Sequence, residues 1–295
     1  MSNWPQLLGA YTELADALRE QRDVREPWRR FADAANVSRS NPPYHLRPLL
    51  RVLQRTKLAP ERIRLLEHGF GSAKSLLYLL ALGYRGIHGV DIETDCSGWN
   101  KLLREIFGIS EPRFFSYDGA KLPFPDESFD LIFSQQVIEH VSTDMLEDYC
   151  AEEARVLCPG GLAYHQIPHR LVPYDSHTRT WFIHYAARPL ALKLYALMKR
   201  DVSFVRNHLF LRSRKTYAAI FAKYLGPCED LTAERLIRDR VEGYYDGPAG
   251  LRRVLSRLFA SSAAGPLFAG LARHFMMADI LVTKRAAITA AASAS

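Results

Sequence analysis

A glycine-containing run, LLEHGFGSA, lies at residues 65–73 and offers the clearest chemistry in the sequence. It follows a short apolar run and precedes a helix-length segment, so it should form the turn between a strand and a helix. Glycines at such a turn let the backbone bend sharply and let a ligand approach it without meeting a Cβ atom. The free N–H groups at a helix start also attract a carboxylate or a phosphate. The run therefore predicts a cofactor-binding loop.

Three binding patterns compete for this loop. The phosphate-binding pattern GxxxxGK[ST] matches at its end, Lys74-Ser75, but neither of its glycine positions holds a glycine. The dinucleotide pattern GxGxxG fails at one position, where Lys74 replaces the third glycine. The third pattern, an acidic residue followed by glycines two and four positions later, is met by Glu67, Gly69 and Gly71.

Four further runs follow in order: GVDI at residues 89–92, YDG at 117–119, LPFPDESFDLIFSQQVIEHV at 122–141 and RVLCPGG at 155–161. With the glycine loop they resemble the ordered motifs of class I S-adenosylmethionine-dependent methyltransferases. The longest run resembles the ubiquinone-biosynthesis-like subgroup, and the resemblance covers about residues 62–170. One departure is Ala73, where the family usually has a third glycine.

The resemblance implies how these residues would hold the expected cofactor, S-adenosylmethionine. Backbone at Gly69 and Gly71 would pass beside its amino-acid end, and Glu67 would anchor the loop. Asp91 would accept hydrogen bonds from both ribose hydroxyls, since a carboxylate has acceptors enough for two. Asp118 would accept one from the adenine amino group. The remaining expected contacts are Ile92, Gly119 and, near the sulfonium, Ser134 and Gln135.

Three of these assignments have simpler alternatives when the residues are taken alone. Asp91 would also fit a cap at the end of a strand, and Asp118-Gly119 would also fit a simple turn. Glu67 would also fit a structural ion pair with a nearby arginine, and that role is compatible with cofactor binding.

The catalytic group is less well defined, because methyl transfer from an activated cofactor needs mainly positioning. A base is required only if the acceptor must lose a proton. Histidine suits that role because its ordinary pKa is near 6.5. The candidates are His140, His169 and His177, with His184 in the same aromatic region as His177. Each of them would also fit a structural role.

Short apolar runs alternate with helix-length segments from residue 63 onward, and these elements must position the motifs. Such alternation indicates a parallel sheet covered by helices on both faces. The expected strands are residues 63–66, 87–92, 114–117, 131–133, 161–167 and 274–283. The expected fold is a doubly wound α/β domain, and the resemblance implies the Rossmann-like methyltransferase fold, with seven mostly parallel strands of which the last is antiparallel.

Four parts of the chain differ in pattern. Residues 1–60 should form a helical N-terminal segment, because apolar residues recur there at three- and four-residue spacing. Residues 61–170 should form the cofactor-binding methyltransferase core. Residues 171–285 should form a helical lid and acceptor region with the closing strand. Residues 286–295, rich in alanine and serine, should form a frayed tail.

Aromatic residues are dense in the expected lid region. The segment PYDSHTRTWFIH at residues 173–184 is typical of a lid over a small acceptor, or of an appended helical layer packed on the domain. Helices are expected at residues 188–199 and 213–225. The first carries leucines on one face and basic residues at its ends. It should either pack on the domain or rest on an anionic membrane that holds a lipid-linked acceptor.

The bulk properties exclude some classes of protein. The formal charge is +7, but no block of five or more basic residues occurs, so no nucleic-acid partner is predicted. The four cysteines form no CxxC pair and no Cys/His cluster of zinc-finger spacing, so no metal site is predicted. The N-terminus lacks the pattern of a signal peptide, and the longest uncharged run, residues 258–272, is broken by Gly265-Pro266. These features predict a cytoplasmic protein with, at most, peripheral membrane contact.

The sequence as a whole predicts an enzyme that methylates a small or medium-sized acceptor such as a sugar, glycolipid or secondary metabolite. One alternative is a methyltransferase-like protein that binds the cofactor without turnover. A less favoured alternative is a nicotinamide-dependent oxidoreductase, against which Lys74 and the run at residues 122–141 argue.

Overall fold

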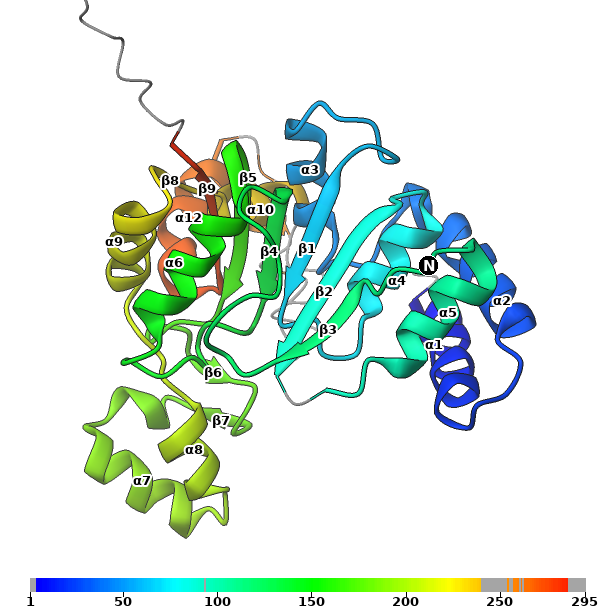
Figure 1. Ribbon diagram of the computed structural model, residues 1–295. Coiled ribbons are helices and arrows are strands. Elements are labelled where there is room, and N and C mark those ends of the chain that lie inside the picture. The colour runs from blue at the N-terminus through cyan, green and yellow to red at the C-terminus, as the bar shows by residue number, and fades with distance from the viewer. Residues whose placement is uncertain are drawn as a thin grey trace, which may run out of the picture.

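A seven-stranded sheet forms the centre of the computed structural model, which describes residues 4–92, 94–239, 254, 257–259, 261 and 263–285 (Figure 1). The strand order is β3-β2-β1-β4-β5-β9-β8. The first five are parallel to one another, and β9 is antiparallel to both of its neighbours. The strands are β1 Arg64–His68, β2 Gly86–Ile92, β3 Phe114–Tyr117, β4 Phe129–Gln135, β5 Leu157–Ile167, β8 Cys228–Asp230 and β9 Ala278–Thr283.

This topology confirms the predicted doubly wound fold, with seven strands and an antiparallel last strand. The strand order reverses between β1 and β4. In open α/β sheets, ligands bind at the carboxyl ends of the strands beside such a reversal. The glycine loop follows β1, so the sequence motif and the topology point to the same edge.

Helices cover both faces of the sheet. One face carries α1 Trp4–Arg19, α2 Arg25–Val37, α3 Arg47–Arg55, α4 Lys74–Ala81 and α5 Ser97–Phe107. The other face carries α6 Leu146–Val156 and α9 Arg214–Tyr224. Successive side chains of β1 point to opposite faces of the sheet. Leu65 is fully buried on the face that carries α1–α5, and Leu66 is fully buried on the face that carries α6 and α9.

The N-terminal helices are attached directly to the glycine loop. The hydroxyl of Tyr11, on α1, donates a hydrogen bond of 2.6 Å to the carbonyl oxygen of Ser72. The helices α1 and α2 pack on each other, and α1 also contacts α5. A 3-10 turn, Ser38–Ser40, follows α2. This segment therefore braces the loop from the outside.

The chain between β5 and β8 forms a small lobe before it returns to the sheet. A hairpin of β6 Tyr174–Asp175 and β7 Thr180–Trp181 is followed by a 3-10 turn, Ile183–Tyr185. The helices α7 Arg188–Leu197 and α8 Val202–His208 then pack around Tyr195 and Val205. In Figure 1 this lobe lies beyond the carboxyl edge of the sheet.

Three features of this region differ from the sequence prediction. The β6–β7 hairpin and β8 both lie in the region that was predicted to be a helical lid with only a closing strand. The helix α9 belongs to the cover of the sheet, since Tyr217 and Phe221 are fully buried against it. The helices α10 Thr232–Asp239 and α12 Gly265–Ala272 pack on each other, and a 3-10 turn, Arg273–Phe275, leads into β9.

No helix in the part of the chain that the structure describes is long and apolar enough to cross a membrane. The predicted frayed tail, residues 286–295, lies outside the described residues.

Candidate active site

The glycine loop leaves β1 in a conformation that favours glycine. Gly69 and Gly71 have φ angles of +83° and +50°. A Cβ atom on Gly69 would lie 2.5 Å from Cγ2 of Val137, which follows β4. A Cβ on Gly71 would meet no described atom within 4 Å. Gly69 is thus required for conformation and for close packing, whereas Gly71 is required for conformation and borders open space.

Ala73 adopts the left-handed conformation that the expected third glycine would adopt easily. Its φ is +56°, and it directly precedes α4. Its side chain is fully buried. The departure from the family pattern is therefore accommodated in place, at the modest cost of a left-handed alanine, about 1–2 kcal/mol.

Asp91 ties the loops after β1 and β2 together. Its Oδ2 accepts a hydrogen bond of 2.6 Å from the N–H of Gly71, and its Oδ1 accepts one of 2.8 Å from the N–H of Ile92. The carboxylate therefore lies beside the glycine loop at the carboxyl end of β2. From this position the carboxylate could reach the ribose of a bound cofactor, as the resemblance implies.

The expected adenine contacts lie next to Asp91. Ile92 pairs with Tyr117 in the register of β2 and β3, so Asp118 and Gly119 follow at the same edge. Ile92 is 56% exposed, and a Cβ on Gly119 would lie 3.8 Å from its Cγ2. Asp118 is exposed, and the N–H of Ala120 holds the pKa of its carboxyl below the ordinary value. An apolar platform flanked by carboxylates thus forms along this edge.

Glu67 lies below the glycine loop and contacts the start of α4. Its side chain is buried, and burial raises its pKa well above the ordinary value. The hydroxyl of Ser75 and the N–H of Leu76 both hydrogen-bond to it, and this lowers the pKa in part. Oε1 of Gln135 lies 3.2 Å from the same Ser75 hydroxyl oxygen, and its amide nitrogen donates a hydrogen bond of 2.9 Å to the carbonyl of His45.

The prediction for Ser134 is wrong. Successive residues of a strand face opposite sides of the sheet, so Ser134 points away from the side that Gln135 faces. Its hydroxyl lies 2.9 Å from Nδ1 of His165 and is only 1% exposed. On the same side, Nδ1 of His68 lies 2.9 Å from a carboxylate oxygen of Glu153. The Ser134 side chain therefore belongs to a buried polar network under α6.

The structure also contradicts a catalytic role for His169. The ring is fully buried, and its Nε2 lies 2.8 Å from the carbonyl of Met276. The N–H of Leu171 donates to its Nδ1 at 3.2 Å. Burial lowers the pKa of this histidine to about 4. Both nitrogens bind the backbone, so His169 joins the end of β5 to the approach of β9.

His140 and His177, by contrast, come together around Glu139. Their ring centroids lie 4.8 Å apart, with the rings nearly perpendicular. The distances from Oε1 of Glu139 to Nε2 of His140 and of His177 are 3.9 and 3.6 Å. Both histidines were predicted as candidate site residues, but Glu139 was not, although it directly precedes His140 in the run VIEHV.

Glu139 is fully buried, and burial raises its pKa to about 8. Neither carboxylate oxygen has a hydrogen-bond partner on another described residue. Its own carbonyl oxygen accepts a hydrogen bond from Phe210, which fixes the backbone beside the small lobe. Buried polar groups nearly always have a hydrogen-bond partner, so a buried carboxylate without one is unusual.

A cavity of about 480 Å³ opens beside this cluster, at the carboxyl ends of β4 and β5. Gln136 and Gln166 line it from the sheet, and Met276 lines it from the start of β9. The predicted lid segment, residues 173–184, supplies Tyr174, Asp175, Trp181 and His184 to its wall. The rings of Tyr174 and Trp181 lie 5.1 Å apart. Asp175 also holds Nδ1 of His177 at 3.0 Å, so the cavity and the histidine cluster share this residue.

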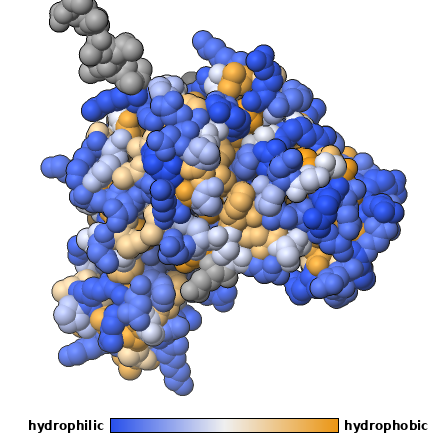
Figure 2. Space-filling view, in the orientation of Figure 1, coloured by the Kyte–Doolittle hydropathy of each residue, from blue (hydrophilic) through white to orange (hydrophobic). Residues whose placement is uncertain are grey.

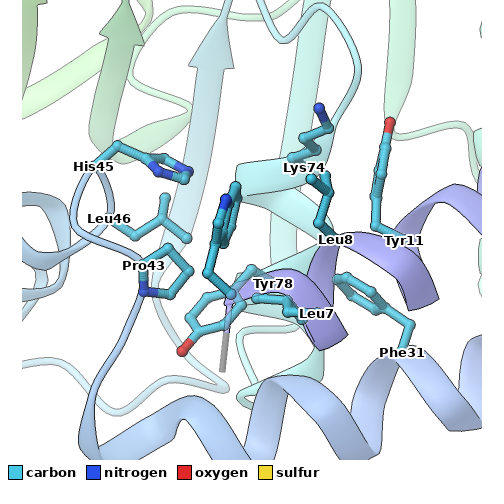
Figure 3. Close-up of a pocket in the computed structure, with 10 residues that line it drawn as sticks. Leu7, Leu8, Tyr11, Phe31, Pro43, His45, Leu46, Lys74 and Tyr78 are labelled. Atoms are coloured by element: carbon cyan, nitrogen blue, oxygen red, sulfur yellow. The ribbon is translucent and has the colours of Figure 1, made fainter. Parts of the chain in front are cut away.

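A second cavity lies under the N-terminal helices and is too small for a cofactor. Its volume is about 20 Å³, which is room for about one water. Figure 3 shows the apolar side chains of α1 around it, with Lys74 and His45 at its border. Nζ of Lys74 lies 4.9 Å from the ring centroid of Tyr11. This space reflects the packing of α1 against the core.

Comparison with known proteins adds independent information. The family model described as a methyltransferase domain matches residues 66–165. This match does not distinguish the ubiquinone-biosynthesis-like subgroup from other methyltransferases, so the assignment to that subgroup stays a prediction. No curated protein sequence matches this chain.

Two solved structures illustrate the structural matches. Phosphoethanolamine N-methyltransferase 2 of Haemonchus contortus, in complex with S-adenosyl-L-methionine, is 17% identical with a TM-score of 0.47. The match covers 80% of this chain and 52% of that one, so this chain spans about half the length of that protein. Geranyl diphosphate C-methyltransferase of Streptomyces coelicolor A3(2), in complex with Mg²⁺, geranyl diphosphate and S-adenosyl-L-homocysteine, is 14% identical. That match has a TM-score of 0.46 and covers 86% of this chain and 82% of the other.

The family match, the ordered motifs and the sheet topology agree over the same part of the chain. Residues 66–165 match the family model of a methyltransferase domain, and they lie within the part of the chain that carries the ordered motifs.

Proposed function

We propose that this protein transfers the methyl group of S-adenosylmethionine to a small or medium-sized acceptor held in the cavity over β4 and β5. The observation that carries the proposal is the position of this cavity. It opens at the same edge of the sheet as the glycine loop and Asp91, one strand further along. Its volume of about 480 Å³ suits a small-molecule site, for which about 300–1,000 Å³ is usual.

The transfer is an in-line displacement at the methyl carbon. A lone pair of the acceptor forms the new bond to carbon while the bond from carbon to sulfur breaks. The electron pair of that bond stays on sulfur and gives S-adenosylhomocysteine. An acceptor hydroxyl also has to lose its proton. His140 and His177 lie with Glu139 next to Asp175, which lines the cavity, and we infer that they act on the acceptor side.

The cavity wall favours an acceptor with both apolar and hydroxyl-bearing surface. Tyr174 and Trp181 offer aromatic faces, and Trp181 keeps 46% of its surface exposed. Asp175 and Gln166 make the same wall polar, and their side chains are held by His177 and Thr178 and by Asp279, respectively. Sugars, glycolipids and hydroxylated secondary metabolites combine such surfaces, so they are our preferred acceptor classes.

We propose in addition that α7 rests on an anionic membrane when the acceptor is lipid-linked. Leu190 and Leu197 are seven residues apart, therefore on one helix face, and they are 52% and 80% exposed. Lys199 and Arg200 follow directly after the helix. In Figure 2 this lobe shows apolar patches among hydrophilic residues. Apolar and basic groups together favour an anionic interface.

Thermal unfolding with added ligands tests the proposed function. S-adenosylhomocysteine should raise the melting temperature of the protein, and NAD should leave it unchanged. The reverse result would favour an oxidoreductase. Release of S-adenosylhomocysteine from S-adenosylmethionine should then be measured with a panel of sugars, glycolipids and phenolic metabolites. Cofactor binding without turnover on any of them would favour the alternative of a cofactor-binding protein that lacks activity.

A further inference from the structure

Three potential metal ligands from two separate loops meet at one point. Glu139 and His140 follow β4, and His177 lies in the β6–β7 hairpin. One atom from each of the three side chains lies within 4.8 Å of the other two. Nε2 of each histidine lies 3.6–3.9 Å from Oε1 of Glu139, which is too long for a hydrogen bond. Ligands placed 2.0–2.2 Å from a tetrahedral ion are about 3.4 Å apart, so the two distances to Glu139 are close to those around a shared ion. The separations in the cluster reach 4.8 Å, so the side chains must move closer together when an ion binds.

The hydrogen bonds behind the two rings orient their Nε2 atoms as acceptors. Nδ1 of His140 lies 2.5 Å from the carbonyl oxygen of His208, and a carbonyl can only accept. Nδ1 of His177 lies 3.0 Å from the carboxylate of Asp175. In both rings Nδ1 therefore carries the proton, so in the neutral ring the lone pair is on Nε2. Metal-binding histidines are held in this manner, by a carbonyl or a carboxylate at the second nitrogen.

The buried carboxylate of Glu139 supplies a second, independent observation. It is 0% exposed, and neither oxygen has a hydrogen-bond partner on another described residue. A buried carboxyl group whose oxygens have no partner is costly unless a cation or hydrogen-bond donors compensate it. Among the described residues, no lysine or arginine forms an ion pair with Glu139, and its only ion-pair contacts are with the two histidines. A cation between these three groups would satisfy all of them.

We propose that Glu139, His140 and His177 bind a divalent transition-metal ion, such as Zn²⁺, Mn²⁺ or Co²⁺. Two imidazoles and one carboxylate suit these ions, whereas Mg²⁺ and Ca²⁺ prefer oxygen ligands. Three protein ligands leave coordination positions open for water or substrate, as in catalytic rather than structural sites. Asp175 positions His177 from the cavity wall and does not bind the ion itself.

The ion has a clear use next to the acceptor cavity, and this step rests on the proposed function. A hydroxyl that binds a divalent ion becomes more acidic, because the ion stabilises the alkoxide. Its proton passes to water, and the oxygen then attacks the methyl carbon. The two histidines therefore act as ligands, and the acceptor class narrows to molecules that offer a hydroxyl oxygen to the metal.

Direct metal binding tests the site without any acceptor. The chelator-treated protein should bind one Zn²⁺ per chain in calorimetry, and Co²⁺ should give visible absorption bands typical of nitrogen and oxygen ligands. Glu139→Gln, His140→Ala and His177→Ala should each weaken Zn²⁺ binding at least about tenfold. Glu139→Gln keeps the shape of the side chain and cannot ionise, so it should fold at least as well as the wild type.

Two further variants separate this site from non-specific binding. Asp175→Asn should weaken the metal about tenfold, because it removes the charged partner of His177 but no ligand. His274→Ala removes an exposed imidazole outside the cluster and should leave metal binding unchanged. Absence of a one-to-one Zn²⁺ complex, or equal affinity in the three ligand variants and the wild type, would overturn the proposal. Calorimetry with S-adenosylhomocysteine on the same variants reports separately on the proposed function, since these residues lie outside the cofactor loop.

Discussion

Alanine at Gly69 should be far more damaging than alanine at Gly71, although both glycines belong to one loop. Both have positive φ, so each alanine carries the cost of the left-handed conformation, about 1–2 kcal/mol. Only at Gly69 does the new Cβ collide, at 2.5 and 2.7 Å from the two Cγ atoms of Val137. Overpacking of this kind adds about 1–3 kcal/mol. Gly69→Ala should thus destabilise by about 2–5 kcal/mol and Gly71→Ala by about 1–2 kcal/mol.

A double-mutant cycle isolates the collision. Val137→Ala removes both Cγ atoms, which leaves only its Cβ, at 3.2 Å, near the new methyl group. Combined with Gly69→Ala it should recover about 1–3 kcal/mol, whereas combined with Gly71→Ala it should recover nothing. The assay is urea unfolding followed by circular dichroism, with calorimetry of S-adenosylhomocysteine on each folded variant.

The cofactor result should follow the stability result. Displacement of the loop in Gly69→Ala should weaken S-adenosylhomocysteine at least tenfold, about 1.4 kcal/mol, and Val137→Ala should restore part of this loss. Equal stability of the two glycine variants, together with no coupling to Val137, would refute the reasoning that Gly69 is required for close packing.

Three further predictions concern other parts of the site. Asp91→Ala should weaken the binding of S-adenosylhomocysteine by about 1.5–3 kcal/mol in calorimetry, whereas Asp33→Ala, at an exposed position of α2, should not. Equal affinities of the two variants would show that Asp91 only caps its strand. Trp181→Ala should raise the KM for the acceptor about tenfold with little change in cofactor affinity. Phe182 does not line the cavity, so Phe182→Ala should change neither quantity. If Trp181→Ala weakened the binding of acceptor and cofactor equally, the lid would serve only to stabilise the fold. His169 should make unfolding pH-dependent, because its folded pKa of about 4 lies below the ordinary value and the unfolded chain binds the proton more tightly. The contribution of His169 to the free energy of unfolding is complete above about pH 6.5 and falls by about 1 kcal/mol between pH 7.5 and 5.5. This fall should be absent when the unfolding free energy of His169→Gln is measured against pH. Identical pH profiles of the variant and the wild type would contradict this.

The sheet could be predicted where its strands are long apolar runs next to sharp turns. Residues 114–117 were predicted and observed as the same strand, and the predicted strand at 87–92 became Gly86–Ile92. The short strands could not be predicted, because two or three residues carry no periodicity of their own. Cys228 becomes part of β8 only through its pairing with Val282, far along the chain.

The motifs predict which strand ends meet at the proposed cofactor edge, whereas the prediction for Ser134 could have been avoided. Glu67, Asp91 and Asp118 each lie at a strand end, so a parallel sheet must bring them to one edge. Adjacent residues of a strand cannot both face one ligand with their side chains, so Gln135 and Ser134 should not have been paired.

The acceptor side depends on contacts that the local sequence does not contain. His169 and His177 look alike as polar residues after β5. Only the approach of β9 buries the first, and only the return of the β6–β7 hairpin brings the second to Glu139. The absence of zinc-finger spacing therefore said nothing about a cluster that the tertiary fold assembles.

Hydrogen exchange of the backbone, measured by mass spectrometry with and without S-adenosylhomocysteine, tests the central claim that the carboxyl edge of β1–β3 binds this cofactor. The account predicts slower exchange in peptides covering residues 67–75, 88–92 and 117–120, which contain the glycine loop, Asp91 and Asp118. Peptides from α9, on the outer face of the sheet, should be unchanged. Ligand binding that leaves the three peptides unprotected, or no binding at all, would contradict the account.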